Sequence, residues 1–370
     1  MPGPIDELIL TAEVETVTIG LEPVASGLYS LMLIYKAEHI SGLSDWVIET
    51  AAAMTQEERE RLALLINGLP YAIIPERSWP SFPAFLQHLE NQDAHRLRDK
   101  LLTAYARVPP ILGRDCWRME QEPLDVDLEE VLASEDAYLG FLKERFDADH
   151  LDEAVERKAY AYVMDPPAMQ RLIVSHLRSM WERYLGPEWK RAKPMLRDAV
   201  KAWQQVDFSG MSRLEAAQLI TGQTLEGEKW ETLDEMERVI FVPSAHAGPY
   251  YGRLFGGGIL WVMFGARPPE GVAFDAPDLS RAEIVVRLNA LADDTRLRVL
   301  QLIADRGEQR SQDIMEQLDV SQSAASRHLK QLSATGYLAE RRCNGAKCYA
   351  LNTERIANTL KAVESFLLGS

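Results

Sequence analysis

Residues 311–335, SQDIMEQLDVSQSAASRHLKQLSAT, decide how the C-terminal part of this 370-residue chain folds. The pattern predicts a short helix, a tight turn at Asp319, and a second helix that Ser321 caps and Gly336 ends. Asp tolerates the left-handed backbone that such a turn needs. Apolar residues of the two helices would face each other, with small Ala325 where the helices cross closely. The stretch therefore predicts a helix-turn-helix.

Polar residues of the second helix gather on its outer face, which carries Gln322, Ser323, Ser326, Arg327 and Lys330. A helix that presents such side chains from its N-terminal half fits the major groove of DNA, where they would meet base edges. His328 stands three residues from Ala325. Its spacing leaves open whether it packs against the core or contacts a phosphate, so we include it among the candidate DNA-binding residues.

The following segment, YLAERRCNGAKCYALN (337–352), predicts a β-hairpin because Asn-Gly is the strongest short signal for a hairpin turn. A hairpin after a helix-turn-helix forms a wing. This wing supplies three cations for contacts to phosphate or to the minor groove, namely Arg341, Arg342 and Lys347. A last helix then begins near Thr353, with apolar residues spaced by three and four.

Cys343 and Cys348 flank the turn of the wing and allow two interpretations. If Gly345-Ala346 forms the turn, the two cysteines face each other and could form a redox switch. The restrictive geometry of a cross-strand disulfide favours the alternative, in which they are small, half-buried residues. The only other cysteine is Cys116, so no disulfide framework is expected and a reducing cytoplasm is the simplest location.

Charge divides the chain into two unlike parts. The net charge is −16, which taken whole argues against a protein that coats nucleic acid or an anionic membrane. Residues 281–370 hold 13 basic and 11 acidic side chains, whereas residues 1–280 hold 27 and 45. Residues 320–350 alone have a net charge of +4. The acidity therefore belongs to the first part of the chain, and the predicted DNA-facing edge is basic.

The sequence pattern of the first part, residues 1–265, predicts helices and a few strands. Residues 9–19 have strand composition. The apolar runs 239–242 and 259–264 should pair with each other, and the N-terminal strand could join them. Residues 266–280 are rich in proline and lack periodicity, which indicates a linker. The start of the chain has no signal-peptide pattern, and no apolar run approaches the roughly 20 residues of a membrane helix, so no membrane contact is expected.

Features that could carry chemistry are sparse in this first part. All eight tryptophans precede the linker, and each is expected to be core more often than pocket lining. The loop 244–255 is the candidate ligand mouth, through His246, Tyr250, Tyr251 and Arg253. The group of His88, His95 and Asp99 has poor spacing for a metal, and the glycines 256–258 lack the rest of a phosphate-binding loop. We therefore expect no catalytic residue, metal or cofactor.

Three linked motifs carry a resemblance to a known family: LADDTRLRVLQLI, VSQSAASRHLKQLSATGYL and the NGAKCYAL hairpin. In this order they resemble the ArsR/SmtB family of winged-helix transcriptional regulators, over about residues 281–368. The resemblance implies a homodimer joined through residues 282–292 and 353–367, and repression that an effector relieves. The Cys-x-Cys and the His residues of metal-sensing members have no counterpart in SQDIMEQLD or in the last helix, so no metal site is carried over.

These observations predict a mainly α protein with little β structure. It comprises an effector or oligomerisation domain (1–265), which resembles the uncharacterised N-terminal domain of large ArsR-type regulators, a linker (266–280) and a winged helix (281–370). The function they predict is a dimeric repressor on an inverted-repeat operator of double-stranded DNA, controlled by a small effector. Two alternatives stay open: a scaffold whose winged helix docks a protein, and a catalytic N-terminal domain with a regulatory tail.

Overall fold

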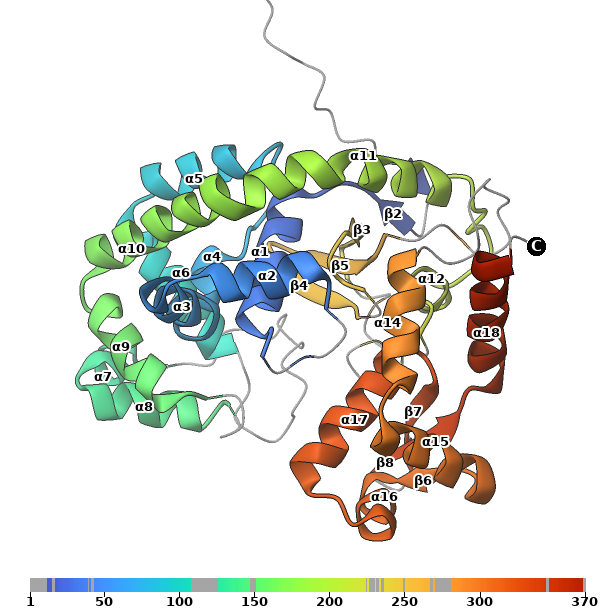
Figure 1. Cartoon of the computed structure of the whole chain (residues 1–370). Helices are drawn as coiled ribbons and strands as arrows, with labels where there is room; N and C mark the ends of the chain where they lie inside the picture. The colour runs from blue at the N-terminus through green and yellow to red at the C-terminus, as the bar shows by residue number, and fades with distance from the viewer. Residues whose placement is uncertain are drawn as a thin grey trace, which may run out of the picture.

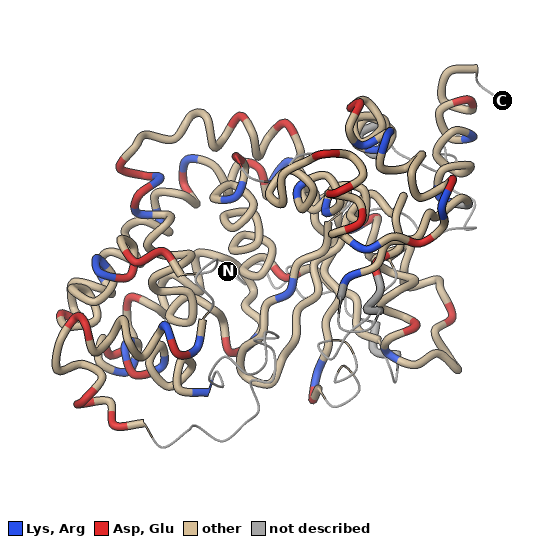
Figure 2. Tube along the Cα trace, turned by 90° about the horizontal axis from the view of Figure 1, so that it is seen from below, with Lys and Arg blue, Asp and Glu red and all other residues tan. Residues whose placement is uncertain are grey.

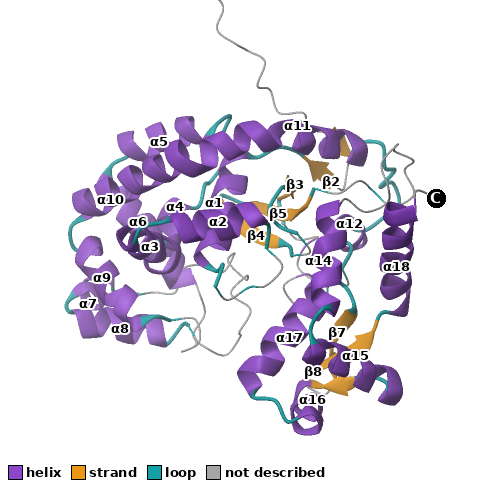
Figure 3. Cartoon of the chain, in the orientation of Figure 1, coloured by secondary structure: helices purple, strands orange, loops and turns teal. Residues whose placement is uncertain are grey.

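The computed structural model describes residues 12–14, 17–38, 40, 43–107, 126–146, 151–223, 225, 230, 233, 236–248, 250–266, 269, 281–343 and 346–368. Figure 1 shows a large N-terminal part, built of helices around a sheet, with the C-terminal module at one side. Helices dominate both parts and the strands form two small sheets (Figure 3). The predicted fold class is thus confirmed.

The sheet of the N-terminal part has five strands in the order β1-β2-β3-β5-β4. Their bounds are β1 (Ala12–Val14), β2 (Val17–Ile19), β3 (Arg238–Ser244), β4 (Gly252–Gly256) and β5 (Ile259–Gly265). β3 pairs in parallel with β5 and with β2, so the predicted pairing of the two apolar runs is confirmed. Continuous apolar runs are typical of parallel strands because both of their faces are buried.

Two details of the strands differ from the sequence prediction. The segment 9–19 contains two short antiparallel strands, β1 and β2, where a single strand was expected. Part of the predicted loop 244–255 is strand β4, which forms an antiparallel hairpin with β5. The turn of this hairpin uses Gly257 and Gly258, both with positive φ (58° and 76°). A Cβ on Gly257 would lie 2.0 Å from the Glu76 carbonyl oxygen, so the position requires glycine.

Helices cover both faces of this sheet. Their bounds are α1 (Pro23–Tyr35), α2 (Asp45–Ala53), α3 (Gln56–Ala63), α4 (Pro70–Ile73), α5 (Phe82–Asn91), α6 (Ala94–Arg107), α7 (Leu128–Leu132), α8 (Glu135–Lys143), α9 (Glu153–Val163), α10 (Pro166–Met180), α11 (Gly186–Trp203) and α12 (Arg213–Thr221). Ile240 and Trp261 face the larger core, which includes α1 and α10, whereas Phe241 and Val262 face the core of Trp203 and α12. The sheet therefore lies between two helical layers.

α10 and α11 run on as one long rod (Figure 1), because the π-helical turn η2 (Trp181–Leu185) joins them. A second such turn, η1 (Leu64–Gly68), follows α3. Gly186 keeps a right-handed helical backbone, so the helix continues through Gly186-Pro187. A Cβ on Gly186 would lie 2.9 Å from the Trp181 carbonyl oxygen, so glycine permits the tight approach within the turn. π-Helical turns often accompany functional sites.

The C-terminal module begins with α14 (Arg281–Leu291) and α15 (Asp294–Arg306). It continues through β6 (Gln309–Arg310), α16 (Ser311–Leu318), α17 (Gln322–Ala334), β7 (Leu338–Cys343), β8 (Ala346–Leu351) and α18 (Thr353–Leu368). Its three-stranded sheet has the order β6-β8-β7, and one apolar core joins α15, α16, α17 and the sheet. Of the predicted linker, only Ala266 and Pro269 are among the described residues. No helix in the described part of the chain is both long and apolar enough to span a membrane.

A buried carboxyl on α9 predicts an unusual pH dependence of stability. Glu156 is 4% exposed, and burial, followed by the charge of Asp152, raises its pKa to about 8. Folding therefore increases proton uptake, so stability falls as the pH rises toward 8. Between about pH 6.5 and 8, we expect the protein to lose about 2 kcal/mol of unfolding free energy, and Glu156→Gln to abolish this loss. Urea unfolding at several pH values measures both.

The measurement is confined to this pH range because, at lower pH, a second buried group changes the stability of the protein in the opposite direction. Burial lowers the pKa of His176 to about 4, so this imidazole adds stability as the pH rises toward its ordinary value near 6.5. Glu182→Gln, at an exposed position, is the matched control and should keep the parental slope. An equal slope in Glu156→Gln and the parent would contradict the assignment to Glu156.

Candidate nucleic-acid interface and ligand pocket

The helix-turn-helix is formed by α16 and α17. Asp319 ends α16 with a left-handed backbone (φ 52°, ψ 52°), and among the described residues it is the one non-glycine with positive φ. The predicted turn is thus confirmed. The hydroxyl of Ser321 accepts a hydrogen bond from the Ala324 amide at 3.3 Å, which confirms Ser321 as the N-cap of α17. The cap fixes the N-terminal end of the helix that would enter a groove.

The outer face of α17 has the composition that the sequence predicted. All five polar residues assigned to it are exposed: Gln322, Ser323, Ser326, Arg327 and Lys330. The opposite face is buried, with Ala325 and Leu329 each 1% exposed and Leu332 fully buried. The structure therefore gathers two cations and three hydrogen-bonding side chains on one solvent-facing surface, which we call the recognition face.

His328 does not belong to the recognition face. Its side chain is 7% exposed, and Nδ1 lies 3.7 Å from Oδ1 of Asp293, the residue that caps α15. Burial lowers the pKa of His328, the Asp293 carboxylate opposes this shift, and Arg327 and Arg296 add to it. Its inclusion among the DNA-contacting residues was wrong, because position 328 packs α17 against the start of α15.

The strand register of the wing shows whether Cys343 and Cys348 lie opposite each other. Cys343 pairs with Ala346 across Asn344-Gly345, whereas Cys348 pairs with Arg341. The cysteines are therefore not opposite each other, which corrects the geometry on which a redox switch depended. Cys348 is a free, buried thiol (4% exposed).

The three predicted wing cations lie on β7 and β8. Arg342 and Lys347 are backbone partners across the wing, next to the pair of Arg341 and Cys348. Lys347 is exposed, and its Nζ lies 2.6 Å from Oε1 of Glu340. The side chains of Arg341 and Arg342 lie outside the described part. Their backbone positions put both arginines on the strand beside Lys347, in the basic segment that the sequence indicated.

Figure 2 shows acidic residues spread over the helices of the N-terminal part, interspersed with basic ones. This part of the molecule approaches α17 at two places. Nε2 of Gln223, which follows α12, donates to the Ala334 carbonyl oxygen at 3.2 Å. Lys36 follows α1; burial, and then repulsion by Lys330, lowers its pKa. The recognition helix is thus in electrostatic and hydrogen-bonding contact with the domain that precedes it.

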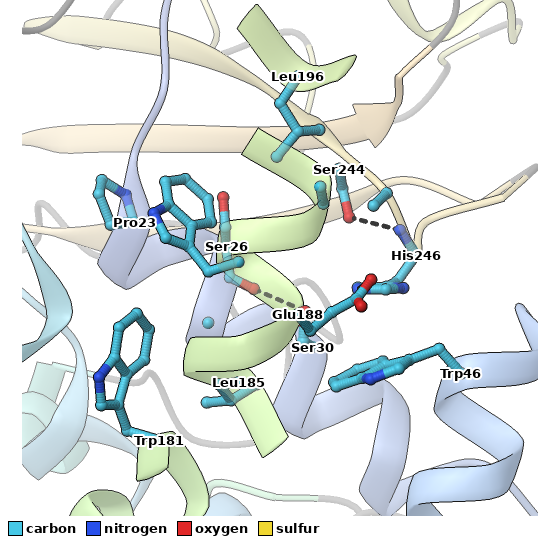
Figure 4. Close-up of a pocket in the computed structure, with 14 residues that line it drawn as sticks. Pro23, Ser26, Ser30, Trp46, Trp181, Leu185, Glu188, Leu196, Ser244 and His246 are labelled. Carbon is cyan, nitrogen blue, oxygen red and sulfur yellow. Dashed lines mark hydrogen bonds and ion pairs between the residues drawn. The ribbon is translucent and has the colours of Figure 1, made fainter. Parts of the chain in front are cut away.

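A narrow pocket lies between α1, α11 and the end of β3 (Figure 4). Three tryptophans from different elements contribute to its lining: Trp46 of α2, Trp181 of η2 and Trp189 of α11. Small residues of α1, Ser26, Gly27 and Ser30, leave the space, and the remaining lining residues are Pro23, Leu185, Glu188, Ala192, Leu196, Ser244, Ala245 and His246.

The polar end of this pocket is a chain of three side chains. His246, 5% exposed, stacks on Trp46 with ring centroids 4.3 Å apart. Its Nε2 lies 3.3 Å from Oε1 of Glu188 and its Nδ1 lies 3.1 Å from Oγ of Ser44. Burial opposes ionisation of Glu188, but hydrogen bonds and charge from His246 and Arg191 outweigh it and lower its pKa to about 2. The carboxylate is therefore ionised at neutral pH.

The other members of the predicted ligand mouth lie elsewhere. Tyr251 packs edge-on against Trp230 at 5.4 Å between centroids, and the Arg253 guanidinium lies 4.8 Å from the same ring. Tyr250 packs against the core on the opposite face of the sheet. Of the four residues of the predicted mouth, His246 lines the pocket and the other three do not. Adjacent residues of an extended segment point to opposite faces, which separates them.

Sequence reasoning did not bring Ser26, Trp46 and Glu188 together, because more than 140 residues separate some of them along the chain. The structure also shows where the histidines lie that were considered as metal ligands. His88 packs at a tilt against Trp79, with ring centroids 4.7 Å apart, and His95 is an exposed residue of α6. In the described residues, no group of three His, Cys, Asp or Glu side chains is arranged to hold a metal ion.

Comparison with curated proteins and with solved structures found no match to the chain. A family comparison matches only the C-terminal module, over α15, α16, α17 and the start of β7, which are the elements that build and carry the recognition face. This match supports a DNA-binding transcriptional regulator. Residues 293–340 match the model of the bacterial regulatory protein, arsR family, and so identify the C-terminal module as an arsR-type helix-turn-helix domain.

Proposed function

We propose that this protein is a dimeric transcriptional repressor that binds an inverted-repeat operator and responds to a small effector through its N-terminal part. The observation that carries the DNA-binding role is the recognition face of α17, where Gln322, Arg327 and Lys330 are exposed beside buried Ala325 and Leu329. A helix of this composition can read base edges in the major groove while the basic wing contacts phosphates.

Dimerisation is supported by apolar side chains on the first and last helices of the module. Ile284 of α14 packs with Ala362 and Val363 of α18, so the two helices lie together. On the same two helices, large apolar side chains remain exposed, namely Val285 (48%), Leu288 (38%), Leu360 (55%), Phe366 (44%) and Leu367 (70%). Such a patch fits a second copy of the same helix pair, which would bury it around a two-fold axis.

The test of DNA binding uses the full-length protein and a random-sequence duplex library. Sequences that the protein retains are recovered, and their affinity is measured by fluorescence anisotropy at a stated salt concentration. We expect an inverted repeat with half-sites about one helical turn or a multiple apart. Retention without any shared sequence would contradict sequence-specific binding. Recovery of a protein partner, with no DNA retained, would favour the scaffold alternative.

Arg342→Ala should weaken binding to operator and to random DNA equally, by about threefold, and reduce the salt slope by about one. The reason is that a cation on the wing neutralises a phosphate, which has the same charge in every sequence. Titrations at several salt concentrations on both duplexes give the slope. A loss confined to the operator would show instead that Arg342 reads a base.

We also propose that the N-terminal part binds without catalysing a reaction. The chain of Ser44, His246 and Glu188 resembles the order of a nucleophile, a base and an acid. However, Arg191 binds the Glu188 carboxylate through two nitrogens, at 2.5 and 2.7 Å. Ser44 is also not among the residues that line the pocket. These features suit a His246 imidazole that is held in place and does not act as a catalytic base. Recovery of a bound compound chemically unchanged after incubation with the protein would support this proposal.

A further inference from the structure

We infer that the pocket between α1 and α11 is a binding site for a small, uncharged, flat aromatic molecule with a hydrogen-bond donor at one edge. The inference that this ligand is the effector rests on the proposed regulatory function. The inference that the pocket binds such a ligand does not depend on that function. The two aspects are therefore tested by separate measurements.

The walls of the pocket select an apolar, planar molecule. Trp46, Trp181 and Trp189 contribute rings to the lining, and Leu185 and Leu196 add aliphatic surface. Trp181 is held in place because its ring stacks on Phe82, with centroids 4.9 Å apart and planes within 3°. Aromatic rings prefer offset-stacked and edge-on neighbours, so a flat aromatic ligand would use these walls better than a compact aliphatic one.

One end of the pocket provides acceptors for a donor group. The Oγ of Ser26 has no hydrogen-bond partner in the described structure, although the residue is 8% exposed and lines the pocket (Figure 4). A buried hydroxyl without a partner is costly, and a ligand N–H or O–H would satisfy it. Glu188, also buried, lines the same pocket with an ionised carboxylate.

The charge of Glu188 also argues against an anionic ligand. Its counter-ion Arg191 has a side chain that is 67% exposed, and Arg191 is not among the pocket-lining residues. A carboxylate or sulfonate in the pocket would therefore meet the Glu188 oxygens without a facing cation. Because Arg191 already pairs with the carboxylate, a ligand cation is not required either, and a neutral donor fits best.

α1 provides a path from the pocket to the recognition face. It carries Ser26 and Ser30 in the pocket wall, and its last residue is Tyr35. Lys36 follows directly, and the charge of Lys330 on the recognition face is, after burial, the second cause that lowers the pKa of Lys36. A ligand that displaces α1 would therefore change the electrostatic surroundings of Lys330, which is how occupancy of the pocket would alter DNA affinity.

The first test measures binding of indole to the full-length protein by isothermal titration calorimetry. Indole is flat and uncharged and has one N–H donor; indene has nearly the same shape without the donor, and indole-3-carboxylate adds an anion. We expect indole to bind about tenfold more tightly than indene, as one hydrogen bond to a buried acceptor allows, and indole-3-carboxylate more weakly than indole. Equal affinity for indole and indene would overturn the assigned ligand class.

Two variants of Ser26 separate space from hydrogen bonding. Ser26→Leu fills the pocket without breaking a hydrogen bond of the serine hydroxyl, and it should abolish binding of both indole and indene. Ser26→Ala keeps the space and should reduce the preference for indole over indene. Thermal unfolding verifies that each variant is folded. Unchanged indole affinity in a folded Ser26→Leu protein would overturn the site itself.

The effector role is read by adding indole to the complex of protein and selected DNA in the anisotropy assay. A change in DNA affinity that Ser26→Leu abolishes supports it, and indole binding that leaves DNA affinity unchanged overturns it. A protein that binds indole in the pocket but retains no DNA would contradict the proposed function while supporting the ligand site, so the two failures are distinguishable.

Discussion

Arg327→Ala will reduce affinity for the selected operator by about 10- to 100-fold while reducing affinity for random DNA much less. The expected size is that of a bidentate contact from an arginine to a guanine edge, about 1–3 kcal/mol. Arg327 is exposed in the first half of α17, between the exposed Ser326 and the buried His328, so its side chain starts from the face that would enter the groove.

The matched control is Arg171→Ala, which removes an exposed arginine from α10 in the N-terminal part. It changes the net charge by the same amount and should leave both affinities within twofold. Anisotropy titrations of operator and random duplexes at one salt concentration compare the three proteins. Equal losses on both duplexes in Arg327→Ala would show that this residue contacts phosphate and would move base reading to other residues of the recognition face.

The C-terminal module was predictable because its information is local. The left-handed turn at Asp319, the cap at Ser321 and the glycine after α17 each follow from the chemistry of one residue and its neighbours. The same holds for the exposed polar residues of α17, which share one helical face. His328 was the exception, because it is buried next to Asp293, a residue 35 positions earlier that caps another helix. Spacing within α17 carries no information about that contact.

The N-terminal part was predictable only in outline, for the complementary reason. Its two apolar runs indicated buried strands, and their pairing followed. The four residues of the predicted mouth do not share one pocket, because neighbouring residues point to opposite faces of a sheet. The pocket that His246 lines is formed by α1, α2, η2, α11 and the end of β3. Trp181 reaches the pocket only because η2 joins α10 and α11, a π-helical turn that helical periodicity does not reveal.

We expect Leu360→Asp to convert the dimer into a monomer and to weaken operator binding greatly. Leu360 is 55% exposed on α18, and Leu288 is exposed on α14, the helix that packs with α18. An aspartate there is solvated in the monomer and costs little stability, but a dimer would have to bury its charge without a partner. Light scattering after size exclusion should give about 41.8 kDa, the mass of one chain, where the parent gives twice that value.

The effect on DNA affinity follows from the symmetry of the proposed operator. In a dimer, binding of one recognition helix places the second at its half-site, and this coupling adds about 100-fold or more to affinity. Leu360→Asp should lose that factor on an inverted repeat and lose little on an isolated half-site. Asn358→Asp adds the same charge at another exposed position of α18 and should remain a dimer. A dimeric Leu360→Asp protein would place the interface elsewhere, and a monomer with parental operator affinity would argue against two-fold recognition.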